Sequence, residues 1–398
     1  MKDKQAKYPQ LRFKGFTDPW VQRKLTDVGD IARGKSKHRP RNDKKLFGGK
    51  YPFVQTGDVA SAGLFLTNYS QTYNEFGLAQ SKLWPSGTLL ITIAANIAEA
   101  SILGIDAAFP DSIIGFTAKN SDVVFIKTLI DKFSNGLKRK AETSSQANLN
   151  LAKLSDLDIV VPNYDEQKQI SSFFQNLDNL IAANQRKLDL LKEQKKGYLQ
   201  KMFPKNGAKV PELRFAGFTD AWEQRKLGEV ATFLNGRAYK QDELLDSGKY
   251  KVLRVGNFYT NDSWYYSNME LGDKYYVDKG DLVYTWSATF GPHIWSGEKV
   301  IYHYHIWKVE LSKFLDRNFT LQLLEADKAR LLSSTNGSTM IHVTKGDMES
   351  KIVSIPNIDE QKQIGSFFKQ LDDTIALHQR KLDLLKEQKK GFLQNMFV

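Results

Sequence analysis

Two segments of this chain occur twice. Residues 6–25 (AKYPQLRFKGFTDPWVQRKL) recur 202 residues later, with 15 of 20 positions identical. Residues 162–203 recur 194 residues later, with 32 of 42 positions identical. The inserts between the copies, 26–161 and 228–355, show little similarity, and the second is eight residues shorter. Two nearly identical frames around two different inserts predict a pseudo-two-fold fold that presents two different surfaces.

The longer repeat has the pattern of an extended helix. Its apolar residues fall at heptad spacing, interrupted in both copies at the positions of Asn184 and Lys195. Asn163 and its second copy Asn357 each follow a proline and precede a glutamate by three residues, which predicts N-caps of the capping-box type. Because each helix must bury its apolar stripe, we expect the two copies to pack as an antiparallel coiled coil. The alternative is two independent helices, each packed on its own domain.

Both inserts have the pattern of mixed α/β domains. Short β-rich segments beside glycine turns occur near Gly49 and Gly87 and echo in the second insert, and helices are expected over Val123–Phe133 and Phe314–Leu332. The predicted fold class is α/β (α+β), with two globular domains separated and joined by the two long antiparallel helices. The predicted boundaries are 1–161 for the first domain, 162–203 for the central helix, 204–210 for a linker, 211–355 for the second domain and 356–398 for the C-terminal helix.

Composition restricts the possible partners. The formal net charge is +12 and the pI about 9.4, which favours a polyanionic partner over a merely basic soluble protein. There are no cysteines, which excludes disulfides and thiolate chemistry and fits a reducing, cytoplasmic location. The first residues have no apolar signal sequence, and no stretch is apolar enough to predict a membrane span.

Three patterns resemble catalytic motifs, and we reject each. Gly29–Ser36 matches the phosphate-loop pattern GxxxxGKS, but no apolar strand precedes it. His303 and His305 would share one strand face, but no third metal ligand is in view. Glu166 and Lys168 have the spacing of a nuclease fragment, but we expect a solvated ion pair on a helix face. The chain is therefore predicted to be non-catalytic.

The remaining chemistry is that of nucleic-acid binding. Residues 33–45 (RGKSKHRPRNDKK) hold seven Lys and Arg in thirteen positions, and phosphates would neutralise them, although a solvated loop is the alternative. Small polar runs near the end of each insert suit base and phosphate contacts, or else turns and caps. The second insert combines cations with many aromatic residues, most of them expected in the core. The candidate DNA-binding residues are Arg33, Lys35, Lys37, Arg39, Arg41, Ser145, Gln146, Asn148, Arg237, Tyr239, Lys240, Arg254, Asn336, Ser338 and Thr339.

Three of these features together resemble the specificity (S) subunit of type I restriction-modification enzymes. They are the segment 11–16 (LRFKGF) with its repeat, the run Ser145–Asn148 (SQAN), and the 162–203 segment ending QKKGYLQKMF. The matching run of the second insert, Asn336–Ser338 (NGS), departs from the first, so base contacts are less expected there.

The resemblance implies a non-catalytic subunit that binds double-stranded DNA. Each target-recognition domain would read one half of a bipartite target, and the helices would set the spacer and dock two modification subunits. S-adenosylmethionine would bind to those modification subunits, and ATP and Mg to restriction subunits, so no cofactor is expected in this chain. Two alternatives remain: a self-sufficient DNA methyltransferase or nuclease with unrecognised motifs, and a coiled-coil assembly protein that does not bind DNA.

Overall fold

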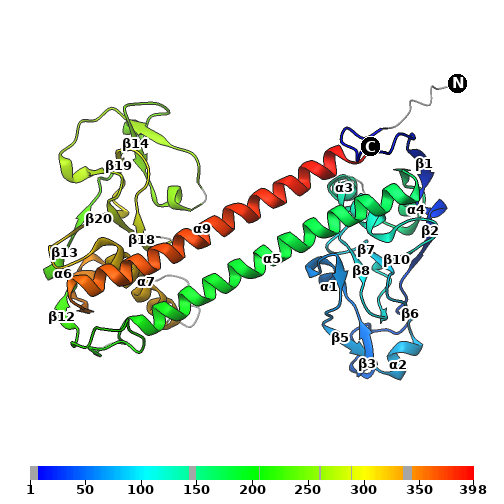
Figure 1. The fold of residues 1–398 in the computed structure, drawn as a ribbon, viewed down its shortest axis with the longest axis horizontal. Helices are drawn as coiled ribbons and strands as arrows, with labels where there is room; N and C mark the ends of the chain where they lie inside the picture. Colours follow the sequence, from blue (N-terminus) through cyan, green and yellow to red (C-terminus); the bar gives the residue numbers. More distant parts are fainter. Residues whose placement is uncertain (1–7, 143–148, 206, 260, 288, 335–342) are drawn as a thin grey trace. The chain divides into compact units, whose positions relative to one another are not determined.

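The computed structural model describes residues 8–142, 149–205, 207–259, 261–287, 289–334 and 343–398. The chain forms two compact units, one made of residues up to Arg186 together with Arg380–Val398, and one made of Lys187–Gln379. Two long helices, α5 (Tyr164–Met202) and α9 (Ile358–Asn395), contribute to both units (Figure 1). The boundary between the two units therefore falls within each long helix. The sequence repeats predict domain boundaries at the ends of those helices.

The first unit contains two sheets, a small two-stranded ribbon and a set of helices. The larger sheet has the order β2-β10-β7-β8-β4, the second β5-β3-β9-β6, and the ribbon pairs β1 with β11. The strands are β1 (Val21–Lys24), β2 (Gly29–Arg33), β3 (Phe47–Phe53), β4 (Phe65–Leu66), β5 (Gln71–Tyr73), β6 (Leu83–Trp84), β7 (Leu89–Thr92), β8 (Ala100–Leu103), β9 (Ala107–Ala108), β10 (Ile113–Ala118) and β11 (Asp158–Val161). The helices are α1 (Thr56–Ser61), α2 (Glu75–Ala79), α3 (Val123–Glu142) and α4 (Leu151–Ser155).

The second unit repeats this plan. Its sheets have the orders β13-β20-β17-β18 and β15-β14-β19-β16, and its ribbon pairs β12 with β21. The strands are β12 (Glu223–Lys226), β13 (Ala231–Asn235), β14 (Tyr250–Leu253), β15 (Tyr265–Ser267), β16 (Tyr276–Val277), β17 (Leu282–Thr285), β18 (Gly291–Ile294), β19 (Val300–Tyr302), β20 (Ile306–Leu311) and β21 (Ile352–Ile355). The helices are α6 (Leu227–Val230), α7 (Arg317–Ser334) and α8 (Lys345–Ser350).

The two units share strand pairing as well as strand order. β3 pairs with β9 in parallel and with β5 antiparallel, and β14 pairs in the same way with β19 and β15. The first unit adds the short strand β4 alongside β8. The strands predicted near Gly49 and Gly87 are β3 and β7, and the predicted helices are α3 and α7. The α/β fold class and the common plan of the inserts are therefore confirmed.

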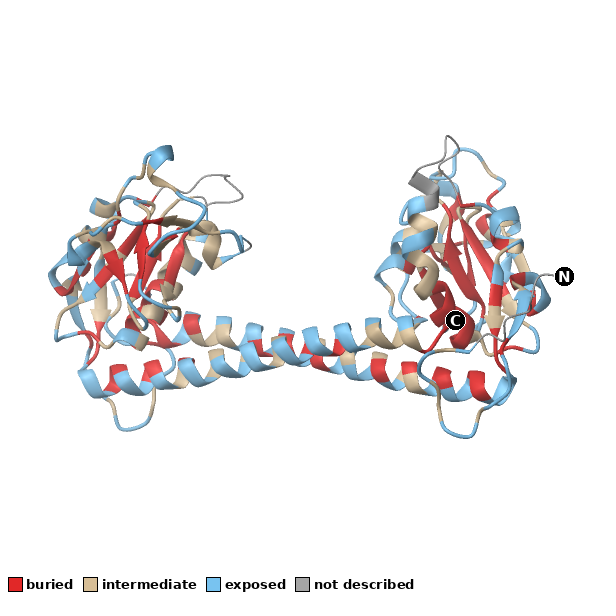
Figure 2. Cartoon of the chain, turned by 90° about the horizontal axis from the view of Figure 1, so that it is seen from above, coloured by how far each residue is buried: buried red, intermediate tan, exposed pale blue. Residues whose placement is uncertain are grey.

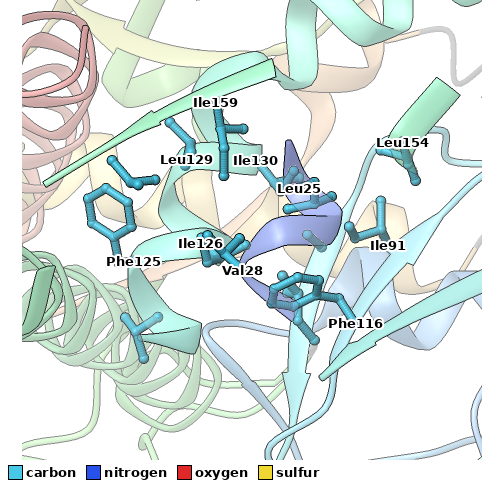
Figure 3. Close-up of a cluster of buried hydrophobic side chains, with 14 of the residues drawn as sticks. Leu25, Val28, Ile91, Phe116, Phe125, Ile126, Leu129, Ile130, Leu154 and Ile159 are labelled. Atoms are coloured by element: carbon cyan, nitrogen blue, oxygen red, sulfur yellow. The ribbon is translucent and has the colours of Figure 1, made fainter. Parts of the chain in front are cut away.

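Each unit is built around an apolar core. In the first, residues of β7 and β10 pack against one face of α3, and Phe116, Phe125 and Ile159 are all fully buried (Figure 3). The central strands β7, β8 and β17 are buried, whereas most of the connecting loops and much of the surface of the long helices are exposed (Figure 2). The apolar residues of the inserts occur at strand and helix spacing, so each strand or helix has one apolar face. The cores remove these apolar faces from water.

The long helices begin as the sequence predicts. The side-chain oxygens of Asn163 and Asn357 each accept the backbone N–H three residues on, at 2.9 Å, so both asparagines are N-caps. The glutamates at those third positions do not complete a capping box. Glu166 instead accepts two hydrogen bonds from Arg12, both at 2.7 Å, and Glu360 is held in the same way by Arg214.

The prediction that Glu166 lies on a solvated helix face is therefore wrong. Its side chain is fully buried, because the described part of the first repeat, residues 8–25, folds over the start of α5 and brings Arg12 to it. A buried carboxylate needs a close cation and donors to offset its loss of hydration, and the guanidinium supplies both. The hydrogen bonds that Arg12 donates to Glu166 also raise the pKa of Arg12 above its ordinary value.

The helices pack antiparallel within each unit, which confirms the expected pairing. In the first unit Phe173 of α5 meets Phe392 of α9 edge-on, with ring centroids 4.9 Å apart. In the second unit Tyr198 of α5 meets Phe367 of α9 at 5.0 Å. The end of one helix thus lies beside the beginning of the other in both units, and the alternative of two independent helices is excluded.

The end of each helix also completes the core of the domain it reaches. Phe397, near the chain end, packs against Trp20, Phe125 and Phe174 in the first unit. Phe203, at the end of α5, packs in the same way against the equivalent residues of the second unit, which are Trp222, Phe319 and Phe368. Each domain core therefore contains residues from both copies of the repeat.

Candidate nucleic-acid interface

The cationic segment 33–45, called the basic loop below, follows β2 on the first unit. Two backbone hydrogen bonds fix the start of this loop. The N–H of Gly34 donates to the carbonyl of Ile113 on β10 at 2.9 Å, and the N–H of Lys37 donates to the carbonyl of Gln80, just after α2, at 3.1 Å. Gly34 is required, because a Cβ there would collide with the carbonyl oxygens of Phe109 and Pro110. The loop is therefore held in one place while its long side chains project outward.

One carboxylate organises the arginines of the basic loop. Asp111, which precedes β10, accepts a hydrogen bond from Arg41 at 2.6 Å and lies 3.9 Å from the guanidinium of Arg39. Arg33 donates to the backbone carbonyl of Asp111 at 2.9 Å. Arg39 also donates to the carbonyl of Ser36 at 2.6 Å. The arginines are thus pre-positioned, and part of their charge is already neutralised; the sequence pattern did not reveal this carboxylate, which lies 70 residues from Arg41.

The lysines of the basic loop differ from its arginines. Lys35 and Lys37 are exposed, and neither forms an ion pair in the described part of the chain. The same holds for Lys44 and Lys45, which the sequence reasoning included in the cluster but did not single out. Four ammonium groups on one loop, none of them in an ion pair among the described residues, repel each other, and binding of a polyanion relieves that repulsion with release of counterions.

An open cleft of about 680 Å³ lies against the basic loop. Arg41, Asn42 and Lys44 line it from the loop, and Phe47 and Phe53 line it from β3. Two glutamines complete the lining, Gln55 before α1 and Gln71 on β5, and the sequence reasoning missed both. No motif marks them, because they lie 16 residues apart and are brought together by the pairing of β3 with β5.

The second unit carries different chemistry at its candidate residues. Arg237 forms two hydrogen bonds with Glu243, at 2.9 and 2.8 Å, and lies over the ring of Tyr239. Those bonds lower the pKa of Glu243 to about 2, so the pair stays ionised and its charges cancel. The hydroxyl of Tyr239 is buried without a hydrogen-bond partner among the described residues, and burial raises its pKa.

The other two cations of the second unit have different environments. Arg254 donates to the carbonyl of Ser263 at 3.1 Å and stacks over Tyr265, with its guanidinium carbon 4.2 Å from the ring centroid. Lys240 is exposed and precedes a short 3-10 helix. Arg254 is therefore held by an aromatic ring, while Lys240 is open to solvent.

Aromatic and histidine side chains gather on the second unit. The hydroxyl of Tyr259 lies 3.0 Å from Nε2 of His293, and Phe258 stacks on the same imidazole with centroids 4.3 Å apart. Burial lowers the pKa of His293 to about 4, helped by the charge of Lys328. Burial likewise lowers the pKa of His303 to about 4. These imidazoles are neutral at physiological pH and add no positive charge to this surface.

The structure also bears on the rejected motifs. Gly29–Arg33 form strand β2 rather than a phosphate-binding loop, in agreement with the rejection. His303 and His305 do not share a strand face as expected, because they lie in the connection between β19 and β20. Within the described ranges no group of three or more potential ligand residues could hold a metal ion, and no helix there is long and apolar enough to cross a membrane.

Two groups of candidates are not placed by the structure. Ser145, Gln146 and Asn148 of the first polar run lie outside the described residues. The same is true of the second run, Asn336, Ser338 and Thr339. Their assignment as DNA contacts stays a prediction.

Comparison with known proteins agrees with this architecture. The family model described as type I restriction modification DNA specificity domain matches residues 17–193 and 219–387. The chain therefore belongs to that family, and each match spans one target-recognition domain with most of its long helix. It is a specificity subunit of a type I restriction-modification system with two target-recognition domains.

The relatives match either nearly the whole chain or about half of it. The type I restriction enzyme MjaVIII specificity subunit of Methanocaldococcus jannaschii is 21% identical over 416 aligned residues, which cover 98% of this chain and 95% of that protein. The EcoBI specificity subunit of Escherichia coli is 23% identical over 181 residues, 44% of this chain and 38% of its own. The crystal structure of the S subunit of a type I system from M. genitalium has a TM-score of 0.64 at 15% identity, covering 98% of this chain and 99% of that one.

Proposed function

We propose that each target-recognition domain binds double-stranded DNA and reads one half of a bipartite target, without catalysing a reaction itself. The observation that carries this proposal is the pairing of one scaffold with two dissimilar surfaces. The first surface offers the exposed lysines of the basic loop beside a cleft, and the second offers aromatic rings with Arg254 and Lys240. Two domains of one fold that carry different side chains are suited to bind two different base sequences.

We further propose that the chain works with two modification subunits and with restriction subunits in the cytoplasm. S-adenosylmethionine would be bound by the former, and ATP and Mg by the latter, so that this chain needs no cofactor of its own. Leu190 on α5 and its repeat equivalent Leu384 on α9 support two equivalent docking sites, since both are more than half exposed. An exposed leucine at the same place in each repeat fits a partner that binds twice.

The test of the proposed function exchanges one insert. Residues 26–161 are replaced by the corresponding insert of a related chain, and methylated adenines are mapped in DNA treated with the complex reconstituted with modification subunits. We expect one half-site to change and the other to stay, because the frame contacts are nearly the same in both units. A change in both half-sites would contradict independent reading, and methyl transfer by the chain alone would contradict its non-catalytic role.

A second test addresses the spacer, which we propose is set by α5 and α9. Four residues inserted after Gln185 lengthen an α-helix by about 6 Å, or one to two base pairs of B-DNA. They also turn the following residues by about 40°, which a coiled coil absorbs by local unwinding. The variant should therefore methylate the parental half-sites with a spacer longer by one or two base pairs. A two-residue insertion is the control, since its turn of about 200° exposes Leu188 and should inactivate the protein. An unchanged spacer in the four-residue variant would show that the helices do not set the distance.

A further inference from the structure

The cleft of the first domain holds a pair of amides in direct contact. The Nε2 amino group of Gln55 donates to the Oε1 oxygen of Gln71 at 2.6 Å. It is the one side-chain hydrogen bond found for these two amides among the described residues, and it uses neither the carbonyl oxygen of Gln55 nor the second N–H of Gln71. An amide oxygen has two lone pairs and an amide nitrogen two N–H groups, so the pair can still offer an acceptor and a donor at the cleft.

Both glutamines are positioned by regular structure. Gln55 is the N-cap residue of α1, and its backbone N–H donates to Asp58 at 2.8 Å. Gln71 lies on β5, opposite Phe53 of β3. Asp58 also accepts from the hydroxyl of Ser70 at 3.1 Å, which ties the residue before Gln71 to the start of α1. Side chains anchored in this way lose little further freedom on binding, which favours specific hydrogen bonds.

The surroundings of the amide pair fit the edge of a duplex. Arg41 and Lys44 line the same cleft, and both are exposed, so they can contact phosphates. Asn42 adds a third amide, and it is exposed. Cations and neutral amides that line one cleft are the combination expected when phosphate contacts position a protein and amides read the bases.

We propose that the Gln55–Gln71 pair is a base-reading element of the first domain and that it recognises an adenine through its major-groove edge. Adenine offers an acceptor, N7, beside a donor, the N6 amino group, and a glutamine amide offers the complementary donor and acceptor. Here the amino group of Gln71 would donate to the base and the carbonyl oxygen of Gln55 would accept from it. This inference rests on the proposed function, because it assigns the residues that carry it in one half-site.

The experiment maps methylation by complexes that contain Gln55→Leu or Gln71→Leu. Leucine keeps the approximate shape of glutamine and removes its hydrogen bonds. At one position of the half-site that follows the 26–161 insert, we expect the preference for adenine to fall about 5- to 150-fold, the range for loss of a bidentate base contact. Gln71→Glu should shift the preference at that position toward cytosine, because a carboxylate accepts from the N4 amino group of cytosine.

The control is Gln10→Leu, which changes an exposed glutamine of the same unit outside the cleft and should leave the target unaltered. If the leucine variants weakened methylation equally on all sequences, the pair would contact the DNA backbone and the proposal would be wrong. An unaltered target, or a change in the other half-site, would also overturn it. If the unaltered complex itself had no bipartite target, the proposed function would fail instead. Unchanged thermal unfolding of the leucine variants separates these results from loss of folding.

Discussion

The two units of this protein share their frame and differ in their surfaces. The buried ion pair of Arg12 with Glu166 in the first unit and that of Arg214 with Glu360 in the second have the same N–O distance, 2.7 Å. The exposed surfaces have no such correspondence: one carries uncompensated lysines and the other aromatic rings and neutral imidazoles. Residues that contact the frame are restricted by packing and buried charge, whereas residues that face solvent can change at little cost in stability.

The same contrast appears where each domain meets the paired helices. Lys389 on α9 pairs with Asp178 on α5 at 2.7 Å, and its counterpart Lys195 pairs with Asp372 at 2.6 Å. Each pair faces an acid on the domain helix, either Asp131 on α3 or Glu325 on α7, and burial raises the pKa of both acids. The lysines that interrupt the heptad pattern thus form ion pairs with the opposite helix. Both units have this ion pair, whereas the acid on the domain helix is an aspartate in the first unit and a glutamate in the second.

The largest effects are expected from the rings that each repeat inserts into a domain core. Phe397→Ala should destabilise the first unit by about 3–5 kcal/mol, and Phe203→Ala should do the same to the second, because each leaves a cavity among aromatic rings. Hydrogen exchange of backbone amides, followed separately in each unit, measures the two losses. Leu190→Ala, an exposed position on α5, is the control. If Phe397→Ala instead lowered the stability of the second unit, the assignment of Phe397 to the core of the first unit would be contradicted.

A smaller effect should distinguish the units by pH. His293 and His303 have pKa values of about 4 in the folded protein, below the unfolded value of about 6.5. The unfolded chain then binds more protons, so the stability that these neutral imidazoles contribute above pH 6.5 is lost as the pH falls toward 4. After allowance for partial exposure, we expect the second unit to lose about 1–2 kcal/mol between pH 6.5 and 4.5.

The pH effect is checked by hydrogen exchange at several pH values. His293→Gln should flatten the pH dependence of the second unit, and the matched change His38→Gln in the first unit should not affect it. The raised carboxyl pKa values of Asp131 in the first unit and Glu325 in the second act in the opposite direction. Equal loss in both units would show that the imidazoles are not responsible.

The smallest effect is expected within the basic loop. Replacing Lys35 and Lys37 with Ala should weaken DNA binding and make its log–log salt dependence shallower by about one unit per lost phosphate contact. The same replacement of Arg39 and Arg41 should change the slope less, because Asp111 already neutralises part of their charge. Filter binding at several salt concentrations measures both slopes. If all four replacements left the slope of the salt dependence unchanged, the basic loop would not contact DNA phosphates.

The repeats and their patterns carried much of the architecture. The heptad spacing and the asparagine caps predicted α5 and α9 and their antiparallel pairing, because an apolar stripe on an isolated helix must be buried. The glycine turns and apolar runs near Gly49 and Gly87 predicted strands on a common plan. In the candidate site, the density of charge in residues 33–45 was sufficient to select the basic loop, since local charge is a property of the chain itself.

What the sequence could not show are interactions between residues far apart in the chain. The burial of Glu166 depends on Arg12, 154 positions away, and the division of cations into paired arginines and free lysines depends on Asp111. The contact of Gln55 with Gln71 arises from the register of β3 against β5. The amino-acid sequence by itself therefore determined the duplicated frame and the location of the charge. Only the tertiary structure decided which charges are compensated and which amides meet, because hydrogen bonds and ion pairs depend on distances that chain folding sets.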